Sequence, residues 1–367
     1  MEVSMDIVLN YNVKLALGAS QGVGALCSGF GSRAMLLTET IYCSNREKEI
    51  LRMSLERANL KTLHLEFFDG DDPYEFAKMV RSMLYGSKSE AIVVFGGNRL
   101  IHLARWMVNE ESDAQKLKLV LVPAIPGTPF LLRPEGFWGS GHPTDSKFYT
   151  WNSPTVPALV FDPYLSTTMG AKQSVAHLFQ TLFFLLEAVF HEQAGLVIKS
   201  LCFGAIESIW LALEKIYEQP TKADIRLESF EAGLAAALAQ HILPRLAGST
   251  AIMVLEGITF VAQGMIGAIL SPWLLENLAP RSPEMLKKIA KLMNFVFEDE
   301  SPEALGIELG RLVRKLLTKF ELPLRLRDID LVEAELIHAA ELTKDWKTPT
   351  GGIISIENLG VFLRSAF

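Results

Sequence analysis

SEAIVVFGGNRLIHLARWMVN, residues 89–109, is the stretch that decides how the chain folds. It begins with an unbroken apolar run at 91–95, which is typical of a buried strand, and continues into Gly96 and Gly97. Residues 98–109 then have apolar side chains at helical spacing. Glycines at such a turn let a ligand approach the backbone, and the positive end of the helix dipole attracts phosphate. The stretch therefore predicts a strand–turn–helix unit that binds an anionic group.

The segments on either side repeat this alternation of strand and helix. Helical spacing predicts further helices at 46–58 and 73–85. Short apolar runs predict five more strands, at 13–18, 34–39, 62–68, 118–123 and 158–161. Strands that alternate with helices form a mostly parallel sheet, and ligands bind beyond the carboxyl ends of its strands. We expect the following residues at those ends: Gly18, Glu39, Asp69, Gly96 and Pro123.

After Asp162-Pro163 the pattern changes to long helical segments separated by prolines. A chain of 367 residues exceeds what a single hydrophobic core usually serves, since cores stop growing near ~250–300 residues. We therefore predict two domains, a dinucleotide-binding-like α/β domain at 1–163 and an all-helical domain at 164–367. A ligand cleft is expected between them.

The composition excludes several classes of protein. The chain has 35 basic and 42 acidic residues, a net charge of −7, which argues against a nucleic-acid partner. Its three cysteines are too few for a disulfide-stapled secreted scaffold, and its first residues do not have the pattern of a signal peptide. The most membrane-like stretch, 251–270, contains Glu256, Gln263 and three glycines, so we expect a buried helix there. These features predict a cytoplasmic protein that does not bind a membrane.

A second glycine-rich turn, GASQGVG at 18–24, resembles the cofactor turn of short-chain dehydrogenases. Those enzymes also need a Tyr-x-x-x-Lys pair for proton transfer, and Tyr74 and Lys78 have that spacing. The pair follows the glycines too closely for that family, and its surroundings have the pattern of a solvated helix face. We therefore assign it no catalytic role, although the turn could still help to shape a ligand cleft.

A different family resembles the whole chain. The turn at 89–98 resembles the phosphate-binding turn of iron-containing alcohol dehydrogenases, glycerol dehydrogenases and dehydroquinate synthases. Further segments fall in that family's order, at 122–128, 145–165, 261–273 and the C-terminal end. The resemblance implies the dehydroquinate synthase-like fold, which has a Rossmann-like domain, a helical domain and a cleft between them. It also implies a homodimer.

The resemblance also identifies where a divalent metal would be held. Family members use an Asp, a His four residues later and usually two more His, and the i, i+4 spacing puts the first two on one helix face. The matching positions in this chain are Gln173, His177, Ser249 and Gln263. Only His177 keeps the expected residue type, and a neutral amide is a poor substitute for a carboxylate. We therefore expect the metal site to be largely lost.

On the cofactor side the resemblance implies NAD or NADP. The residues that would contact it are Gly96, Gly97, Asn98, Gly127, Thr128 and Lys147. Glu39 ends the second strand, where an acid can hydrogen-bond an adenosine ribose and favour NAD. A strand-end acid is equally often a helix cap, so both roles stay open for Glu39. Phe130 departs from the family pattern, because a small hydroxyl residue is expected there.

The leading hypothesis is a metal-independent, NAD(P)-dependent alcohol dehydrogenase or carbonyl reductase, with His177 or a water that it positions as the proton donor. The alternative is a non-catalytic relative that binds a nucleotide, small molecule or protein partner in the cleft. A third hypothesis, a dehydroquinate-synthase-like lyase, would need the metal. The spacing leaves open whether Gln173, His177 and Glu256 meet. It also leaves open whether a group of aromatic residues lines a pocket or packs the domains together: Phe137, Trp138, Phe148, Tyr149 and Trp151.

Overall fold

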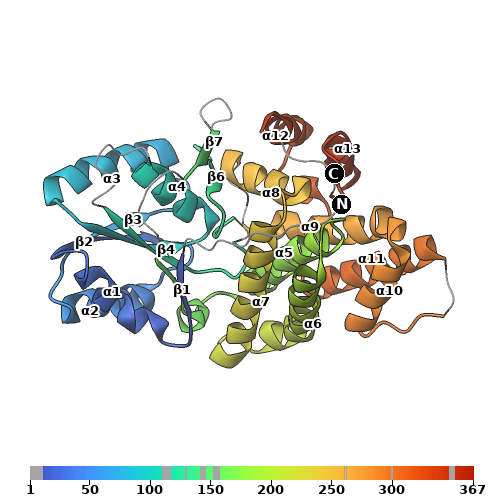
Figure 1. The fold of residues 1–367 in the computed structure, drawn as a ribbon, viewed down its shortest axis with the longest axis horizontal. Coiled ribbons are helices and arrows are strands. Elements are labelled where there is room, and N and C mark those ends of the chain that lie inside the picture. Colours follow the sequence, from blue (N-terminus) through green and yellow to red (C-terminus); the bar gives the residue numbers. More distant parts are fainter. Residues whose placement is uncertain are drawn as a thin grey trace.

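A computed structural model of the chain describes residues 11–109, 117–128, 130–140, 146–151, 158–259, 261, 263–298, 301–346 and 352–367. Within them, a parallel sheet lies in the first half of the chain and a large group of helices in the second (Figure 1). The predicted fold class, a parallel-sheet α/β part followed by a helical part, is confirmed.

Six parallel strands form the sheet, in the order β1-β8-β5-β4-β2-β3. Their bounds are β1 Asn12–Leu15, β2 Arg33–Glu39, β3 Lys61–Phe67, β4 Ala91–Gly96, β5 Lys118–Pro123 and β8 Ala158–Phe161. All six strands predicted from the sequence are present. The four inner strands are buried on both faces, and their unbroken apolar runs made them recognisable, whereas the edge strands β1 and β3 are only partly buried.

Helices cover both faces of the sheet. On one face, η1 Ala19–Gly22 leads into α1 Val23–Ser28, which lies beside α2 Asn45–Arg57, and on the other face lie α3 Pro73–Ser87 and α4 Asn98–Asn109 (Figure 1). Successive residues of a strand point to opposite faces. Leu36 of β2 therefore packs with α1 and α2, whereas Leu37 packs with α3 and α4.

The chain reverses its path across the sheet between β2 and β4. From β2 it continues to β3 on one side, and it then crosses back to β4 on the other side of β2. Such a switch leaves a crevice at the carboxyl ends of the two strands, where open α/β sheets bind ligands. Thr38 pairs with Phe95, so the next residues, Glu39 and Gly96, lie side by side at this crevice.

Beyond β8 the described residues form helices. After η2 Pro163–Ser166 come α5 Ala171–Val189, α6 Leu196–Glu218, α7 Ala223–Ile242, α8 Ala247–Ile258, α9 Met265–Asn277, η3 Ala279–Arg281, α10 Pro283–Leu292, α11 Pro302–Lys319, η4 Leu326–Ile329, α12 Glu333–Asp345 and α13 Leu359–Ser365. The change from mixed to helical structure agrees with the sequence pattern. The domain boundary between 163 and 164 stays a prediction.

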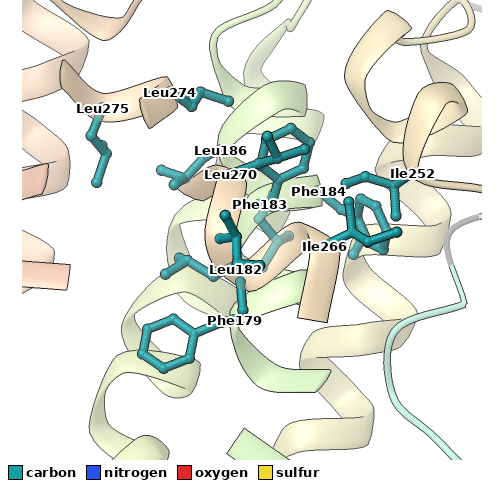
Figure 2. Packing of buried hydrophobic residues seen from close by; sticks show 14 of the residues in the cluster. Phe179, Leu182, Phe183, Phe184, Leu186, Ile252, Ile266, Leu270, Leu274 and Leu275 are labelled. Atoms are coloured by element: carbon teal, nitrogen blue, oxygen red, sulfur yellow. The ribbon is translucent and has the colours of Figure 1, made fainter. Parts of the chain in front are cut away.

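Helix α5 lies at the centre of the helical part. It contacts α6, α7 and α9, and every residue from Ser174 to Val189 is buried. Figure 2 shows side chains of α5, among them Phe183 and Phe184, close to Ile266 and Leu270 of α9. A helix that is buried all round has apolar residues on every face, which accounts for the composition of this segment.

The structure also contains a hairpin that the sequence pattern did not predict. Strands β6 Glu135–Trp138 and β7 Lys147–Thr150 pair antiparallel. Trp138 stacks on Trp106 of α4 with ring centroids 4.0 Å apart, and Phe148 stacks on Trp346, just after α12, at 3.8 Å. Of the two roles considered for the aromatic residues, the Phe148–Trp346 pair shows packing between the α/β part and the helical part, whereas the Trp138–Trp106 pair lies within the α/β part. Strands of four residues are too short for a clear periodic pattern.

The stretch at 251–270, expected to be one buried helix, is interrupted. Helix α8 ends at Ile258 and α9 begins at Met265, so two helices share the stretch. A different helix, α6, has the length and apolar composition of a membrane span, with a mean hydropathy of 1.8. It packs against α5, α7 and α10. Of its most apolar 18-residue window, 44% is buried by these contacts.

A buried carboxylate holds the start of α8. Glu187 of α5 accepts hydrogen bonds from the backbone N–H groups of Gly248 and Ser249 and from the Ser249 hydroxyl. The first N–H groups of a helix have no partner within the helix, so a carboxylate there satisfies them. Burial nevertheless outweighs these hydrogen bonds and raises the pKa of Glu187 to about 7.

This raised pKa predicts a pH-dependent stability. Because the pKa lies above the ordinary value of 4.5, the contribution of Glu187 is fully present below pH 4.5 and is lost as the pH rises through about 7. Between pH 4.5 and about 8, we expect the free energy of unfolding to fall by about 3 kcal/mol more in the wild type than in Glu187→Gln. Urea unfolding at both pH values measures this difference.

Glu228→Gln, at an exposed glutamate of α7, is the matched control and should behave like the wild type. Equal pH dependence in the wild type and Glu187→Gln would contradict the assignment.

Candidate active site

A narrow cleft, with a volume of about 70 Å³, opens at the switch point of the sheet. Its walls come from the ends of β2 and β3, from the start of α4 and from the segment before α9. The lining residues are Glu39, Ile41, Tyr42, Phe67, Phe68, Asp69, Arg99, Val261 and Gln263. The fold therefore brings the strand-end acids Glu39 and Asp69 together with Gln263 from far along the chain.

Two side chains close the turn between β4 and α4. The Gly97 N–H donates to the Glu39 carboxylate at 2.7 Å, and the Asn98 N–H donates to the Gln263 amide oxygen at 2.8 Å. Donors at a helix N-terminus are those that a diphosphate uses. Only glycine permits this approach at position 97, because a Cβ there would lie 2.3 Å from Gln263 Oε1 and 2.7 Å from the Tyr42 ring. The phosphate turn therefore binds the protein's own oxygen atoms.

Glu39 is buried among other charged groups. Burial raises its pKa, and the neighbouring carboxylates of Asp69 and Glu256 add to the rise. The Arg99 guanidinium and the Gly97 N–H act in the opposite direction. The cleft thus contains more acidic than basic side chains, which weakens its attraction for an anionic ligand.

Asn98 connects the turn to a second buried carboxylate. Its side-chain amide donates to Glu256 at 3.1 Å and to the Gly127 carbonyl at 3.3 Å. Glu256 also accepts from the Gln180 amide at 2.8 Å and from the Gly264 N–H at 3.3 Å. Burial raises the pKa of Glu256, and these hydrogen bonds oppose the rise. This network fixes α4, α5 and α8 relative to one another.

Tyr42 of the cleft wall and His177 behind it form a polar corner. The Tyr42 hydroxyl is 3.4 Å from His177 Nε2, and the nearby Gln173 side chain favours the ionised form of Tyr42, which lowers its pKa. Burial, with Arg226 nearby, lowers the pKa of His177 to about 3, so its imidazole is neutral near pH 7. Burial outweighs the effect of Gln173 and raises the pKa of Tyr42, so the phenol keeps its proton. The corner is therefore built from uncharged hydrogen-bonding groups.

Gly264 brings the chain into contact with His177. Its φ is +96°, a conformation that side chains other than glycine rarely adopt. A Cβ there would also lie 2.9 Å from His177 Nδ1, an atom that has no hydrogen-bond partner among the described residues. The turn before α9 thus packs directly on the imidazole and directs the preceding residue, Gln263, into the cleft.

The remaining residues assigned to the cofactor lie in two places. Gly127 joins the turn through its hydrogen bond from Asn98, and Thr128 is buried beside it. Lys147 lies instead on β7, with its ammonium group 5.6 Å from the Trp106 ring. Trp106 is two helical turns beyond Asn98, a rise of ~12 Å. The structure therefore does not bring Lys147 to the turn.

The four positions matched to metal ligands do not meet at one point. Gln173, His177 and Gln263 surround the polar corner, whereas Ser249 binds Glu187, which lies ~15 Å beyond His177 along α5. Within the described residues, no group of three His, Cys, Asp or Glu side chains is placed to hold a metal. The donors that do converge are amides, one imidazole and a phenol. This set does not fit a divalent ion, which favours carboxylate or thiolate ligands with imidazole.

Sequence reasoning missed two residues of the site, Tyr42 and Gln180. Tyr42 belongs to no motif, and its one signal is its position three residues after the strand-end acid Glu39. Gln180 interrupts an apolar helical run, and a buried polar side chain implies a buried partner. In the structure that partner is Glu256. The sequence analysis noted Glu256 but did not indicate that it lies next to Gln180.

The other glycine-rich turn is also closed by an acid. The N–H groups of Gly18 and Ser20 donate to the Asp162 carboxylate at 2.9 and 3.0 Å. The turn therefore ties the end of β1 to the end of β8. Lys78 is exposed on α3 and pairs with Glu75, in agreement with a solvated helix face.

Comparison with known proteins identifies the fold. Neither the scan against protein-family models nor the search of curated proteins finds a match. Among solved structures, a 1,3-propanediol oxidoreductase matches with a TM-score of 0.83 at 18% identity over 100% of both chains. The NADH-dependent butanol dehydrogenase A of Thermotoga maritima matches with a TM-score of 0.81 at 17% identity, covering 99% of this chain and 98% of that one. The iron-containing alcohol dehydrogenase of Corynebacterium glutamicum gives 0.75 at 18% identity, covering 100% and 98%. The chain has the fold of iron-containing alcohol dehydrogenase-like enzymes, as the resemblance implied.

Closure of the turn by Glu39 and Gln263 predicts the effect of a methyl group at position 97. In Gly97→Ala the Cβ would press on Gln263 and Tyr42, and we expect the free energy of unfolding to fall by about 1–3 kcal/mol. Urea unfolding measures the change. Gly86→Ala is the matched control, since a Cβ there would meet nothing within 4 Å, and alanine in a helix should raise stability by about 0.5 kcal/mol. If Gly97→Ala were as stable as the wild type, the turn would not be closed in this way.

Proposed function

We propose that the protein is an NAD(P)-dependent oxidoreductase that interconverts a carbonyl group and an alcohol without a bound metal, with NAD preferred over NADP. The observation that carries the proposal is the helix N-terminus at the switch point, where Gly97 and Asn98 present two N–H donors beside Glu39. When bound, the cofactor supplies or accepts the hydride. The family resemblance further implies a homodimer that binds a small-molecule substrate in its cleft, and the sequence features predict a cytoplasmic location.

The likeness to solved structures supports this class of reaction. It covers essentially the whole chain, and the matched proteins carry the names of alcohol, diol and butanol oxidoreductases. Tyr42 and Val261 also form an uncharged part of the cleft wall. Such a wall suits a carbonyl or alcohol group better than an ionic one.

A bound diphosphate would compete with the protein's own side chains. For it to bind, Glu39 and Gln263 must release the N–H groups of Gly97 and Asn98. Each hydrogen bond given up costs about 1 kcal/mol. Once released, Glu39 stands at the strand end, where an acid accepts a hydrogen bond from a ribose hydroxyl and repels the extra phosphate of NADP. On this proposal Glu39 has a role in both states: it accepts the Gly97 N–H when the cofactor is absent and a ribose hydroxyl when the cofactor is bound.

A second candidate is a non-catalytic protein that binds a small molecule in the same cleft. The observation that favours it is that both backbone donors of the turn are already satisfied. A ligand without phosphate would leave these two hydrogen bonds intact, so it would bind without the cost of exchange.

Removing one competing acceptor tests the first proposal. In Gln263→Ala the Asn98 N–H is left open, so we expect the dissociation constant of NADH to fall about fivefold, equivalent to one hydrogen bond of about 1 kcal/mol. Titration followed by nicotinamide fluorescence measures it, with NADPH in parallel. Gln193→Ala, at an exposed glutamine after α5, is the matched control and should bind as the wild type does.

The same samples are then mixed with a panel of aldehydes and ketones, and NADH oxidation is followed by absorbance. Turnover by the wild type is the expected result. If neither cofactor binds to the wild type or to Gln263→Ala, the oxidoreductase proposal is wrong and the second candidate is favoured. Cofactor binding without turnover on any substrate would also count against catalysis.

A further inference from the structure

Tyr42 occupies the space in which three of the positions matched to metal ligands converge. Its hydroxyl shares a hydrogen bond with His177 Nε2 at 3.4 Å and interacts with the side chain of Gln173, one helical turn earlier on α5. Its ring lies against Gly97, next to the amide oxygen of Gln263. The side chain is buried, yet it forms part of the cleft wall.

A cation at this corner would need the position that the hydroxyl holds. An ion bound to both Gln173 and His177 would lie between their polar atoms, at ~2 Å from each. The Tyr42 hydroxyl already hydrogen-bonds His177 and interacts with the Gln173 side chain. An ion could therefore enter only if the phenol lost its proton and became a ligand, or if the side chain moved away. The carboxylate that would compensate the positive charge is replaced by the neutral Gln173.

Tyr42 also lines the cleft in which a substrate would bind. When hydride adds to a carbonyl carbon, the carbon–oxygen π bond breaks and the oxygen takes up its electron pair, so the oxygen needs a proton. Tyr42 O–H can donate that proton, which forms the alcohol O–H bond and leaves a phenolate that regains a proton from water. The balance requires a reduced nicotinamide dinucleotide as the hydride donor. His177 contacts the hydroxyl and not the cleft wall, so its role is to position Tyr42.

We propose that the Tyr42 hydroxyl stands in for the metal ion of this fold: it closes the corner between Gln173 and His177 to a cation, and it donates the proton to the substrate oxygen. The proton-donor part rests on the proposed function. The exclusion of a cation does not rest on the proposed function, because it concerns only whether the Tyr42 hydroxyl occupies the space between Gln173 and His177.

The proton-donor part is tested with Tyr42→Phe. We expect the turnover number for carbonyl reduction to fall by about 10²–10³-fold, with the dissociation constant of NADH within about twofold of the wild type, as only the hydroxyl is removed. Tyr85→Phe, on the exposed face of α3, is the matched control and should keep wild-type turnover. Tyr42→Phe with wild-type turnover would overturn this part, and so would loss of NADH binding together with turnover, which would mark Tyr42 as structural.

The exclusion of a cation is tested by restoring the other ligands. Gln173→Asp and Gln263→His are combined with His177, once with Tyr42 present and once with Tyr42→Ala. Zinc binding is measured by calorimetry and by metal content after dialysis, so the result does not depend on activity. We expect about one zinc per chain with Tyr42→Ala and at least tenfold weaker binding when Tyr42 is retained.

Three outcomes would overturn this part. Equal zinc affinity with and without Tyr42 would show that the phenol does not close the corner. Tighter binding of iron with Tyr42 present, accompanied by a phenolate-to-iron absorption band, would make Tyr42 a metal ligand. Absence of zinc from both variants would show that positions 173, 177 and 263 do not share one space. If the wild type has no turnover, the proposed function fails, whereas the zinc experiment still decides how the corner is filled.

Discussion

The hydrogen bond from the Gly97 N–H to the Glu39 carboxylate is the constraint on which the rest of the cleft depends. It crosses the switch point of the sheet and joins the end of β2 to the start of α4. Other carboxylates do the same, among them Asp162, Glu187 and Glu256, which accept backbone N–H groups of turns or helix starts. Buried N–H groups must find partners, and an acid is the strongest acceptor available at the positive end of a helix. The protein thus satisfies internally the donors that many α/β proteins leave for a ligand.

This internal closure changes what the site can do. Around Tyr42 the converging groups are a phenol, an imidazole and two amides, all of them uncharged. Groups of this kind hydrogen-bond an oxygen atom and move a proton, whereas polarising a carbonyl by a cation requires ligands that neutralise the cation's charge. The fold and the side chains of the site therefore point to different kinds of chemistry. The fold is that of iron-containing alcohol dehydrogenase-like enzymes, and the proposed chemistry at its cleft relies on hydroxyl and amide groups.

The sequence was most informative where burial is complete. Strands β2, β4 and β5 lie inside the sheet, covered on both faces, and their apolar runs matched the observed bounds closely. It was least informative for the β6–β7 hairpin, whose short strands are held by stacking on Trp106 and Trp346. It also matched Ser249 to a ligand position, although this residue caps α8 with Glu187. Matching by spacing compares positions along the chain, and it gives no information on how the helices that carry these positions pack in space.

The sequence by itself determined the six strands of the sheet with the helices α2, α3 and α4 between them, the change to helices after Asp162-Pro163 and the position of the glycine turn at the end of β4. These features follow from local patterns of apolar residues and glycines, which act over a few residues. Only the tertiary structure decided that Glu39 and Gln263 fill that turn and that Tyr42 lies against His177. Those contacts join residues far apart in the chain. Their partners are chosen by the packing of α5 and the turn before α9 against the edge of the sheet, which no local pattern encodes.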